Sequence, residues 1–354
     1  FNLTVGFVPP TTLNSQRIML ATGHTWKQQR RFALRTLRTL GLGKSGLEHR
    51  VQEEAHDLTL TVTFIIMVAG KPVDPSFALF HSVSNVICAV VYGHRFSRED
   101  ETFHELIKRL CSTSCVSLPQ LYEIFPWLMS RLPGPHKKAL ACYDVLSDFT
   151  RREIRMHTER GIPEELQDFI DFYLDHIEKM HRDEPKSTYN EDNMIYSIND
   201  LFLGGSETSS TTLNWGLLYM VANPDIQEKV QKELDAVLGP SKLICYEDRK
   251  ELPYTNAVVH EIQRFSNIIS VGMPRVCVRN TTMLGFPLKK GTIVLPNIAS
   301  SLYDPEQWET PRQFNPGHFL DKDGNFVAQE AFLPFSIGKW ATAQISAVWI
   351  GTVE

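Results

Sequence analysis

A tryptophan and an arginine four residues apart form the first pair in this chain that could bind a ligand. Trp26 and Arg30 fall on one face of a helix, because side chains at i and i+4 lie one above the other. An indole N–H beside a guanidinium can hold a carboxylate through two donors. A core tryptophan beside an exposed arginine has the same spacing, so the pair predicts an anion site only in combination with other features.

Two glycines and two polar side chains interrupt a long apolar segment. Gly204 and Gly205 precede Glu207 and Thr208, and each glycine costs a helix about 1 kcal/mol relative to alanine. Close approach of a flat ligand, or an opening in the hydrogen-bond ladder, would offset this cost. A carboxylate and a hydroxyl beside such an opening can relay protons. The alternative is a kinked helix in which the threonine bonds back to the preceding turn.

A third set of residues combines a glutamate, an arginine and a distant histidine. Glu261 and Arg264 are spaced i, i+3, which on an exposed helix face is worth only ~0.2–0.5 kcal/mol. His318 follows in the segment Pro311–Phe319 and could complete a network with them. Each of these features alone is common in proteins, so they indicate function only as an ordered set.

Four cations form a basic stripe on the segment that carries the first pair: Lys27, Arg31, Arg35 and Arg38. The stripe begins roughly 100° around the helix from the tryptophan. Residues 1–50 contain eight Lys or Arg and one acidic residue, which favours an acidic partner over this part of the chain. A solvated helix face is the alternative. The overall net charge of −5 gives no indication of nucleic-acid binding.

The cysteines and the apolar runs indicate the redox compartment of the protein and whether a segment could span a membrane. The six cysteines are scattered without zinc spacing, which favours a reducing compartment. We find no signal peptide and no apolar run near the ~18 residues that span a bilayer. The stretch Leu118–Pro135 is rich in aromatic residues and prolines, so it could contact a membrane surface or an apolar ligand, or serve as a packed connector.

Helices must position most of these residues, and the sequence predicts one mainly α domain with a small β portion. Hydrophobic periodicity predicts helices over 25–40, 47–64, 77–92, 103–115, 137–157, 163–180, 191–222, 224–239 and 254–265. Asn223 and Pro224 separate two of them as N-cap and first helical residue. Short β-like runs follow at 276–278, 283–286 and 292–295.

Taken in order, these features lead to Phe335-Ser336-Ile337-Gly338-Lys339 and together become specific. The chain is similar to the microsomal cytochrome P-450 superfamily, and within it to the J subfamily of the second vertebrate family. The stretches that carry the resemblance include Gly41–Lys44, Val83–Cys88, Asp200–Tyr219 and Ala331–Lys339. The resemblance predicts a cytochrome P-450 fold, incomplete, with a haem-thiolate monooxygenase-like domain over 1–339 and a divergent tail over 340–354.

The resemblance implies a haem cofactor and assigns residues around it. Trp26, Arg30 and Arg275 would hold the haem propionates. Phe335 and Gly338 would belong to the loop that passes beneath the porphyrin.

It also assigns residues to the chemistry and to the stability of the core. Glu207 and Thr208 would serve proton delivery during oxygen activation. Glu261, Arg264 and His318 would lock the core near the haem.

The family inserts one oxygen atom into apolar small molecules, using electrons from NADPH-cytochrome reductase. The J subfamily acts on fatty acids such as arachidonate, and related members act on xenobiotics. The resemblance places the protein at the endoplasmic reticulum membrane on the cytosolic face, with the basic stripe as the reductase-binding surface. We expect no anchor segment within residues 1–354.

The haem loop departs from the family pattern F-x-x-G-x-R-x-C-x-G after its first half. Trp340, Thr342 and Gln344 stand where the pattern has Arg, the iron-ligating Cys and Gly. An alcohol is not ionised near neutral pH, whereas a thiol readily becomes a thiolate on a metal. Residues 340–354 contain no Cys or His, so we predict no metal ligand, and we expect the chain to be inactive as printed.

The family's anchor, first strands and first helices, and the long helix after the haem loop, have no counterpart here, so we expect a truncated and less stable core. Two further hypotheses remain open. The chain could be a non-catalytic product that binds the reductase or other partners. It could also be a helical protein that binds an apolar ligand at Gly204 and Gly205, which would leave the other motifs unexplained.

Overall fold

The computed structural model describes residues 3–4, 23–41, 47–70, 73–112, 131, 134–183, 187–239, 243–272 and 275–336. The chain divides into two compact units. Unit 1 comprises Phe1–Leu40, Ser84–Gly204 and Pro274–Val294, and unit 2 comprises Gly41–Val83, Gly205–Met273 and Leu295–Glu354.

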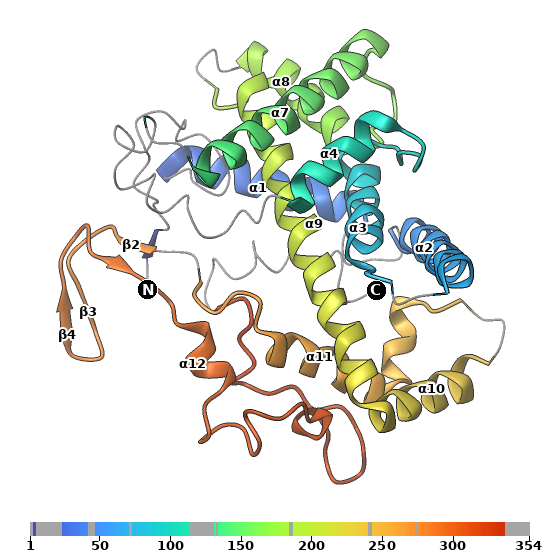
Figure 1. The fold of residues 1–354 in the computed structure, drawn as a ribbon. Coiled ribbons are helices and arrows are strands. Elements are labelled where there is room, and N and C mark those ends of the chain that lie inside the picture. The colour runs from blue at the N-terminus through green and yellow to red at the C-terminus, as the bar shows by residue number, and fades with distance from the viewer. Residues whose placement is uncertain are drawn as a thin grey trace. The chain divides into compact units, whose positions relative to one another are not determined.

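Two helices have residues in both units. They are α3 (Ser76–Val91) and α9 (Glu191–Ala222). The elements are labelled in Figure 1.

Unit 1 is built mainly from helices that pack in pairs. They are α1 (Gly23–Thr39), α4 (Glu101–Ser112), α7 (Pro135–Arg160) and α8 (Phe169–Asp183). α8 packs against both α1 and α7, and α7 also packs against α4. Phe32 of α1 meets Phe169 and Tyr173 of α8 edge-on, with ring centroids 5.7 and 5.0 Å apart. Such pairs contribute about 0.5–1.5 kcal/mol beyond the burial of their area.

The strands of unit 1 are short and antiparallel. β2 (Arg275–Cys277) lies between β1 (Leu3–Thr4) and β5 (Ile293–Val294), and β3 (Thr281–Met283) pairs with β4 (Phe286–Leu288). The mainly α prediction with a small β portion is confirmed.

The predicted strand over 283–286 was wrong, because a two-residue turn breaks it. Leu284 and Gly285 have φ angles of 49° and 83°. This is the left-handed backbone of a hairpin turn that reverses the chain between β3 and β4.

Unit 2 contains α2 (Glu48–Ala69), α10 (Pro224–Leu238), α11 (Pro253–Ser266), α12 (Ile298–Leu302) and two 3₁₀ helices, η1 (Tyr246–Lys250) and η2 (Pro316–Phe319). α11 packs against α10, η1 and η2. Its core joins Ala257 of α11 to Trp308 and Phe319, all of them buried. This packing holds α11 against the coil that follows α12.

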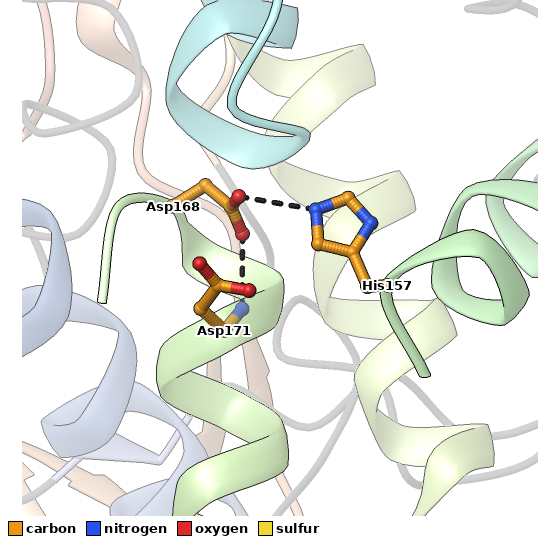
Figure 2. Close-up of side chains that lie close together, drawn as sticks. All are labelled: His157, Asp168 and Asp171. Atoms are coloured by element: carbon orange, nitrogen blue, oxygen red, sulfur yellow. Dashed lines mark hydrogen bonds and ion pairs between the residues drawn. The ribbon is translucent and has the colours of Figure 1, made fainter. Parts of the chain in front are cut away.

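One helix begins later than its periodicity predicts. The sequence predicts a start at Pro163, but α8 starts at Phe169. The Asp168 carboxylate accepts the backbone N–H of Asp171 at 2.9 Å (Figure 2), so it caps the helix there.

Within the described residues, none of the helices has the length and apolar character needed to cross a bilayer.

Candidate functional site

The predicted carboxylate-binding pair, Trp26 and Arg30, lies on α1. The Arg30 guanidinium carbon lies 5.4 Å from the centre of the Trp26 ring, and both side chains are half-buried. Burial, and secondly the charge of Arg38, lower the pKa of Arg30. A partly desolvated guanidinium gains more from an anion than one in water. The position of the Arg30 guanidinium beside Trp26 therefore suits the binding of a carboxylate.

Arg275, the third residue predicted at the cofactor carboxylates, is the first residue of β2. Its backbone pairs with Val294 of β5, and its side chain is half-buried. Burial lowers the pKa of this arginine also. All three residues assigned to the propionates therefore belong to unit 1.

The basic stripe occupies the exposed face of α1. Its members are all exposed: Lys27, Arg31, Arg35 and Arg38. The opposite face is buried and consists of Gln29, Ala33, Thr36 and Leu37. The helix is therefore amphipathic, and its cationic side is free of core packing.

The helix is not interrupted at Gly204 and Gly205, as the sequence had suggested. Both glycines lie within α9, which is helical throughout residues 191–222. Just beyond the glycines, side chains bond back to the helix. The Ser210 hydroxyl donates to the Ser206 carbonyl at 2.8 Å, and the Thr212 hydroxyl donates to the Thr208 carbonyl at 2.9 Å. Intrahelical bonds of this kind satisfy the hydroxyls of these neighbours.

Glu207 and Thr208 both lie in the part of α9 that belongs to unit 2, and both are half-buried. Burial raises the pKa of Glu207 above its ordinary value. A carboxyl whose pKa is moved toward neutrality can exchange a proton more readily near physiological pH.

The glutamate–arginine pair of α11 is fully buried and fully hydrogen-bonded. Arg264 donates to both carboxylate oxygens of Glu261, at 2.7 Å from Nε and 2.8 Å from Nη2. Its remaining guanidinium protons go to the carbonyls of Leu302, Pro311 and Gln313 at 2.7–3.1 Å. All five guanidinium donors thus have acceptors, which is the condition for burying such a charge.

His318 joins the same network through both nitrogens of its ring. The Thr310 N–H donates to Nε2 of His318 at 3.2 Å, so this nitrogen is an acceptor. The proton must therefore sit on Nδ1, which lies 3.3 Å from Oε2 of Glu261. The backbone N–H of Asn315 donates to Oε1 of the same glutamate at 2.8 Å. A neutral histidine thus ties η2 to α11.

Sequence reasoning did not identify the partners that complete this network. Thr310 fixes the tautomer of His318, and Trp308 lies under Arg264 with its ring centre 5.0 Å from the guanidinium carbon. The Trp308 indole donates to the Ser301 carbonyl at 2.9 Å. The many aromatic and proline residues over 303–320 could have indicated these contacts, because a coil of this composition needs specific side-chain contacts to hold it in place.

Phe335 lies beside a small hollow in unit 2. Thr212 of α9, Ser266 of α11 and the following residue Asn267 also line it. Gly338, Trp340, Thr342 and Gln344 lie outside the described residues. The second half of the predicted haem loop is therefore known only as sequence.

These residues fit the acidic groups of a haem but not its iron. Arg30 and Arg275 are partly desolvated cations suited to carboxylates. The iron would need a thiolate from position 342, which is a threonine. Arg30 and Arg275 are therefore of the kind that carboxylates bind, whereas position 342 supplies no thiolate.

Comparison with known proteins gives matches along nearly the whole chain. A family model described as Cytochrome P450 matches residues 9–341. Cytochrome P450 2J2 from Homo sapiens is 45% identical over 327 residues, which cover 92% of this chain and 64% of that protein. Cytochrome P450 2J1 from Oryctolagus cuniculus is 44% identical over 340 residues, covering 94% and 67%.

A third relative, cytochrome P450 2H2 from Gallus gallus, is 40% identical over 325 residues, covering 91% of this chain and 65% of that protein. The chain thus spans about two thirds of the length of these relatives.

Proposed function

Because the chain belongs to the cytochrome P450 family, we propose that it has the framework of a haem-thiolate monooxygenase but does not catalyse the family's reaction as printed. The observation that carries this proposal is Thr342 at the position of the iron-ligating cysteine. The proposed domain extends over 1–339, with a divergent tail over 340–354. In an intact relative, the haem would supply the oxidising centre, and its thiolate ligand would favour cleavage of the O–O bond.

The proposed substrates are apolar small molecules, namely fatty acids such as arachidonate or xenobiotics. NADPH-cytochrome reductase would supply the electrons, at the cytosolic face of the endoplasmic reticulum membrane. These assignments rest on similarity to the J subfamily, in which the most similar relatives named above are found.

We assign Trp26, Arg30 and Arg275 to the propionates, supported by the partial burial of the two arginines. Glu207 and Thr208 are proposed to hold and pass protons, supported by the raised pKa of the glutamate.

Phe335 and Gly338 are assigned to the haem loop. Glu261, Arg264 and His318 are proposed to hold the coil that leads into this loop, supported by their buried network. This network would preserve the scaffold even where the iron ligand is lost.

Turnover tests the proposal directly. The chain is combined with haem, NADPH-cytochrome reductase, NADPH and arachidonate, and oxidised products are measured. We expect none from the wild type. The triple variant Trp340→Arg, Thr342→Cys and Gln344→Gly restores the family pattern and should gain product. Thr342→Val, which keeps the shape of threonine without offering a thiol, should stay inactive. Oxidised product from the wild type would overturn the proposed inactivity.

A second candidate function is a non-catalytic one, in which the chain binds the reductase through the basic stripe. The exposure of all four cations on one face of α1 favours it. Such a chain would compete with intact enzymes for electrons without using them.

Charge reversal distinguishes this second function. The stripe variant carries Glu at Lys27, Arg31, Arg35 and Arg38, and its affinity for the reductase is measured by interferometry at low and physiological salt. The matched control carries Glu at four exposed cations elsewhere: Lys108, Arg155, Lys289 and Lys290. We expect loss of binding only in the stripe variant, with a steep salt dependence in the wild type. Equal binding by all three proteins would exclude the stripe as the docking surface.

A further inference from the structure

The hairpin formed by β3 and β4 exposes large apolar side chains at its turn. Leu284, in the turn, is 91% exposed, and Phe286, the first residue of β4, is 72% exposed. Figure 1 shows the two strands side by side, and among the helices and strands each contacts mainly the other. A single exposed apolar residue is common on a protein surface. Two of them at one turn mark a surface that another apolar body can cover.

The leucine of this turn occupies a backbone position that suits other residues better. Leu284 and Gly285 have φ angles of 49° and 83°. Asparagine or aspartate followed by glycine is usual in such a turn, because these residues tolerate a positive φ. A leucine there carries backbone strain and, at 91% exposure, gains almost no burial in return. An apolar surface outside the chain would offset this cost.

Apolar residues continue from the turn along one face of the hairpin. Met283 pairs with Phe286, and Thr281 pairs with Leu288. Paired residues of antiparallel strands point to the same side, and successive residues alternate between sides. Met283, Phe286 and Leu288 therefore share a face, with Leu284 at its end. We call Met283, Leu284 and Phe286 the hairpin tip.

Cations lie at the opposite end of the hairpin. Arg279, Lys289 and Lys290 are all exposed. The backbone N–H of Lys290 donates to Oδ1 of Asn280 at 2.8 Å, which joins the two arms of the hairpin at this end. Residues 275–294 contain no Asp or Glu. The charge of this end is therefore uniformly positive and complements an anionic surface.

The spacing between the hairpin tip and the cations suits a lipid surface. Lys289 follows Phe286 by three residues, which is about 10 Å of extended strand. Apolar side chains at a membrane interface reach about 5–10 Å into the boundary between headgroups and acyl chains. With the hairpin tip at this depth, the cations lie level with the lipid phosphates. The cytoplasmic leaflet of a membrane carries anionic lipids that attract such cations.

We propose that the hairpin tip inserts into the acyl boundary of an anionic lipid bilayer, while Arg279, Lys289 and Lys290 bind the headgroups. The charge complementarity favours this occupant. A fluid acyl layer also accepts a narrow apolar turn without a matching pocket, which a protein partner would have to supply. The inference rests on the proposed membrane location, and it names the described surface that makes the contact.

The backbone of the hairpin limits the depth of insertion. β3 and β4 form a two-stranded sheet, so each strand has one edge that no other described strand covers. Hydrocarbon offers no hydrogen-bond partners to the peptide groups along such an edge. The backbone therefore stays in the hydrated headgroup region, and only the side chains of the hairpin tip reach the acyl chains.

Vesicle flotation of the full chain tests the proposal, with vesicles of phosphatidylcholine alone or mixed with phosphatidylserine. The tip variant carries Leu284→Asn and Phe286→Thr. Asparagine before Gly285 suits the turn and threonine suits a strand, so the hairpin is kept. We expect the wild type to bind the mixed vesicles. The tip variant should partition at least about tenfold more weakly, because two large apolar side chains no longer leave water.

A charge variant tests the role of the cations. Lys289→Gln and Lys290→Gln should weaken binding to the mixed vesicles by about fivefold for each cation. Added salt should weaken binding of the wild type in the same direction, because it screens the attraction to the headgroups. Equal binding of this variant and the wild type to the mixed vesicles would overturn the assignment of the cations.

The matched control makes the same apolar substitutions elsewhere. Leu60→Asn and Phe64→Thr change exposed residues of α2, 56% and 67% accessible, and should leave vesicle binding as in the wild type. Far-UV circular dichroism and the thermal midpoint check that each variant is folded. Absence of wild-type binding would overturn the proposal and indicate a protein partner instead. Equal binding by the wild type and the tip variant, or an equal loss in the tip variant and the control, would also overturn it.

This assay is separate from the test of the proposed function. It contains no haem, reductase or substrate, so a failure to bind vesicles leaves the turnover result unchanged. Oxidised product from the wild type would likewise leave the vesicle result unchanged.

Discussion

Replacing Glu261 by glutamine should destabilise unit 2 strongly, because it removes the only carboxylate that Arg264 contacts among the described residues. Both side chains are 0% exposed. Each oxygen of Glu261 accepts two hydrogen bonds, from Arg264 and Asn315 on one side and from Arg264 and His318 on the other. The amide of glutamine turns one acceptor into a donor that faces two other donors. Removing one member of a buried ion pair costs about 3–5 kcal/mol.

Urea unfolding measures this cost. With a slope of about 3 kcal/mol per molar, the loss lowers the midpoint by about 1 M or more. Asp148→Asn is the matched control, because Asp148 and Arg151 form an i, i+3 pair on α7 at 2.9 Å that is exposed. The control should lose about 0.5 kcal/mol or less. Equal midpoints for the two variants would refute the assignment of Glu261 and Arg264 as a structural lock.

Three further predictions follow from individual side chains. Burial raises the pKa of Glu207, so its ionisation opposes folding. Glu207→Gln should raise Tm by an amount that grows as pH rises from the ordinary glutamate pKa to the raised folded-state pKa, stays constant above it and vanishes at lower pH. The pKa of His157 is raised, and its Nε2 lies 3.0 Å from Oδ2 of Asp168 (Figure 2), so the pair gives stability that is complete below about pH 6.5 and is lost as pH rises through the folded-state value; His157→Gln should flatten Tm over that window. Gly93→Ala should destabilise more than Gly161→Ala, because both glycines have positive φ but only Gly93 would bring a Cβ against Asp168; equal thermal shifts would contradict this.

The sequence predicted the long regular elements well, because their signals are local. The helix over 191–222 has the bounds that were expected, and Asn223 separates it from α10. The start of α8 was missed, because Pro163 is a favourable first helical residue but the Asp168 carboxylate supplies the actual cap. The hairpin turn was missed because a leucine occupies one of its two left-handed positions.

The candidate site was only partly predictable from the sequence, because many of its contacts join residues that are far apart in the chain. The spacing of Glu261 and Arg264 is visible in one helical turn, but a spacing alone does not distinguish an exposed pair from a buried one. Arg264 can be buried because the carbonyls of Leu302, at the end of α12, and of Pro311, in the coil after it, accept its hydrogen bonds. No local sequence pattern indicates these contacts. A cavity in unit 1 that is lined by His94, after α3, and by His157 of α7 was not predicted at all, since these residues come from separate elements that meet only in the folded unit.

We propose that this cytochrome P450 chain lacks the thiolate that its family places on haem iron, because Thr342 stands at the position of the cysteine. The absorption spectrum of the reduced, carbon monoxide-treated full chain with haem tests it most directly. We predict no Soret band typical of thiolate ligation in the wild type, and its appearance in the variant with Trp340→Arg, Thr342→Cys and Gln344→Gly. A thiolate-type Soret band from the wild-type chain would show that the iron has a thiolate ligand despite Thr342, and the proposed loss of the ligand would be wrong.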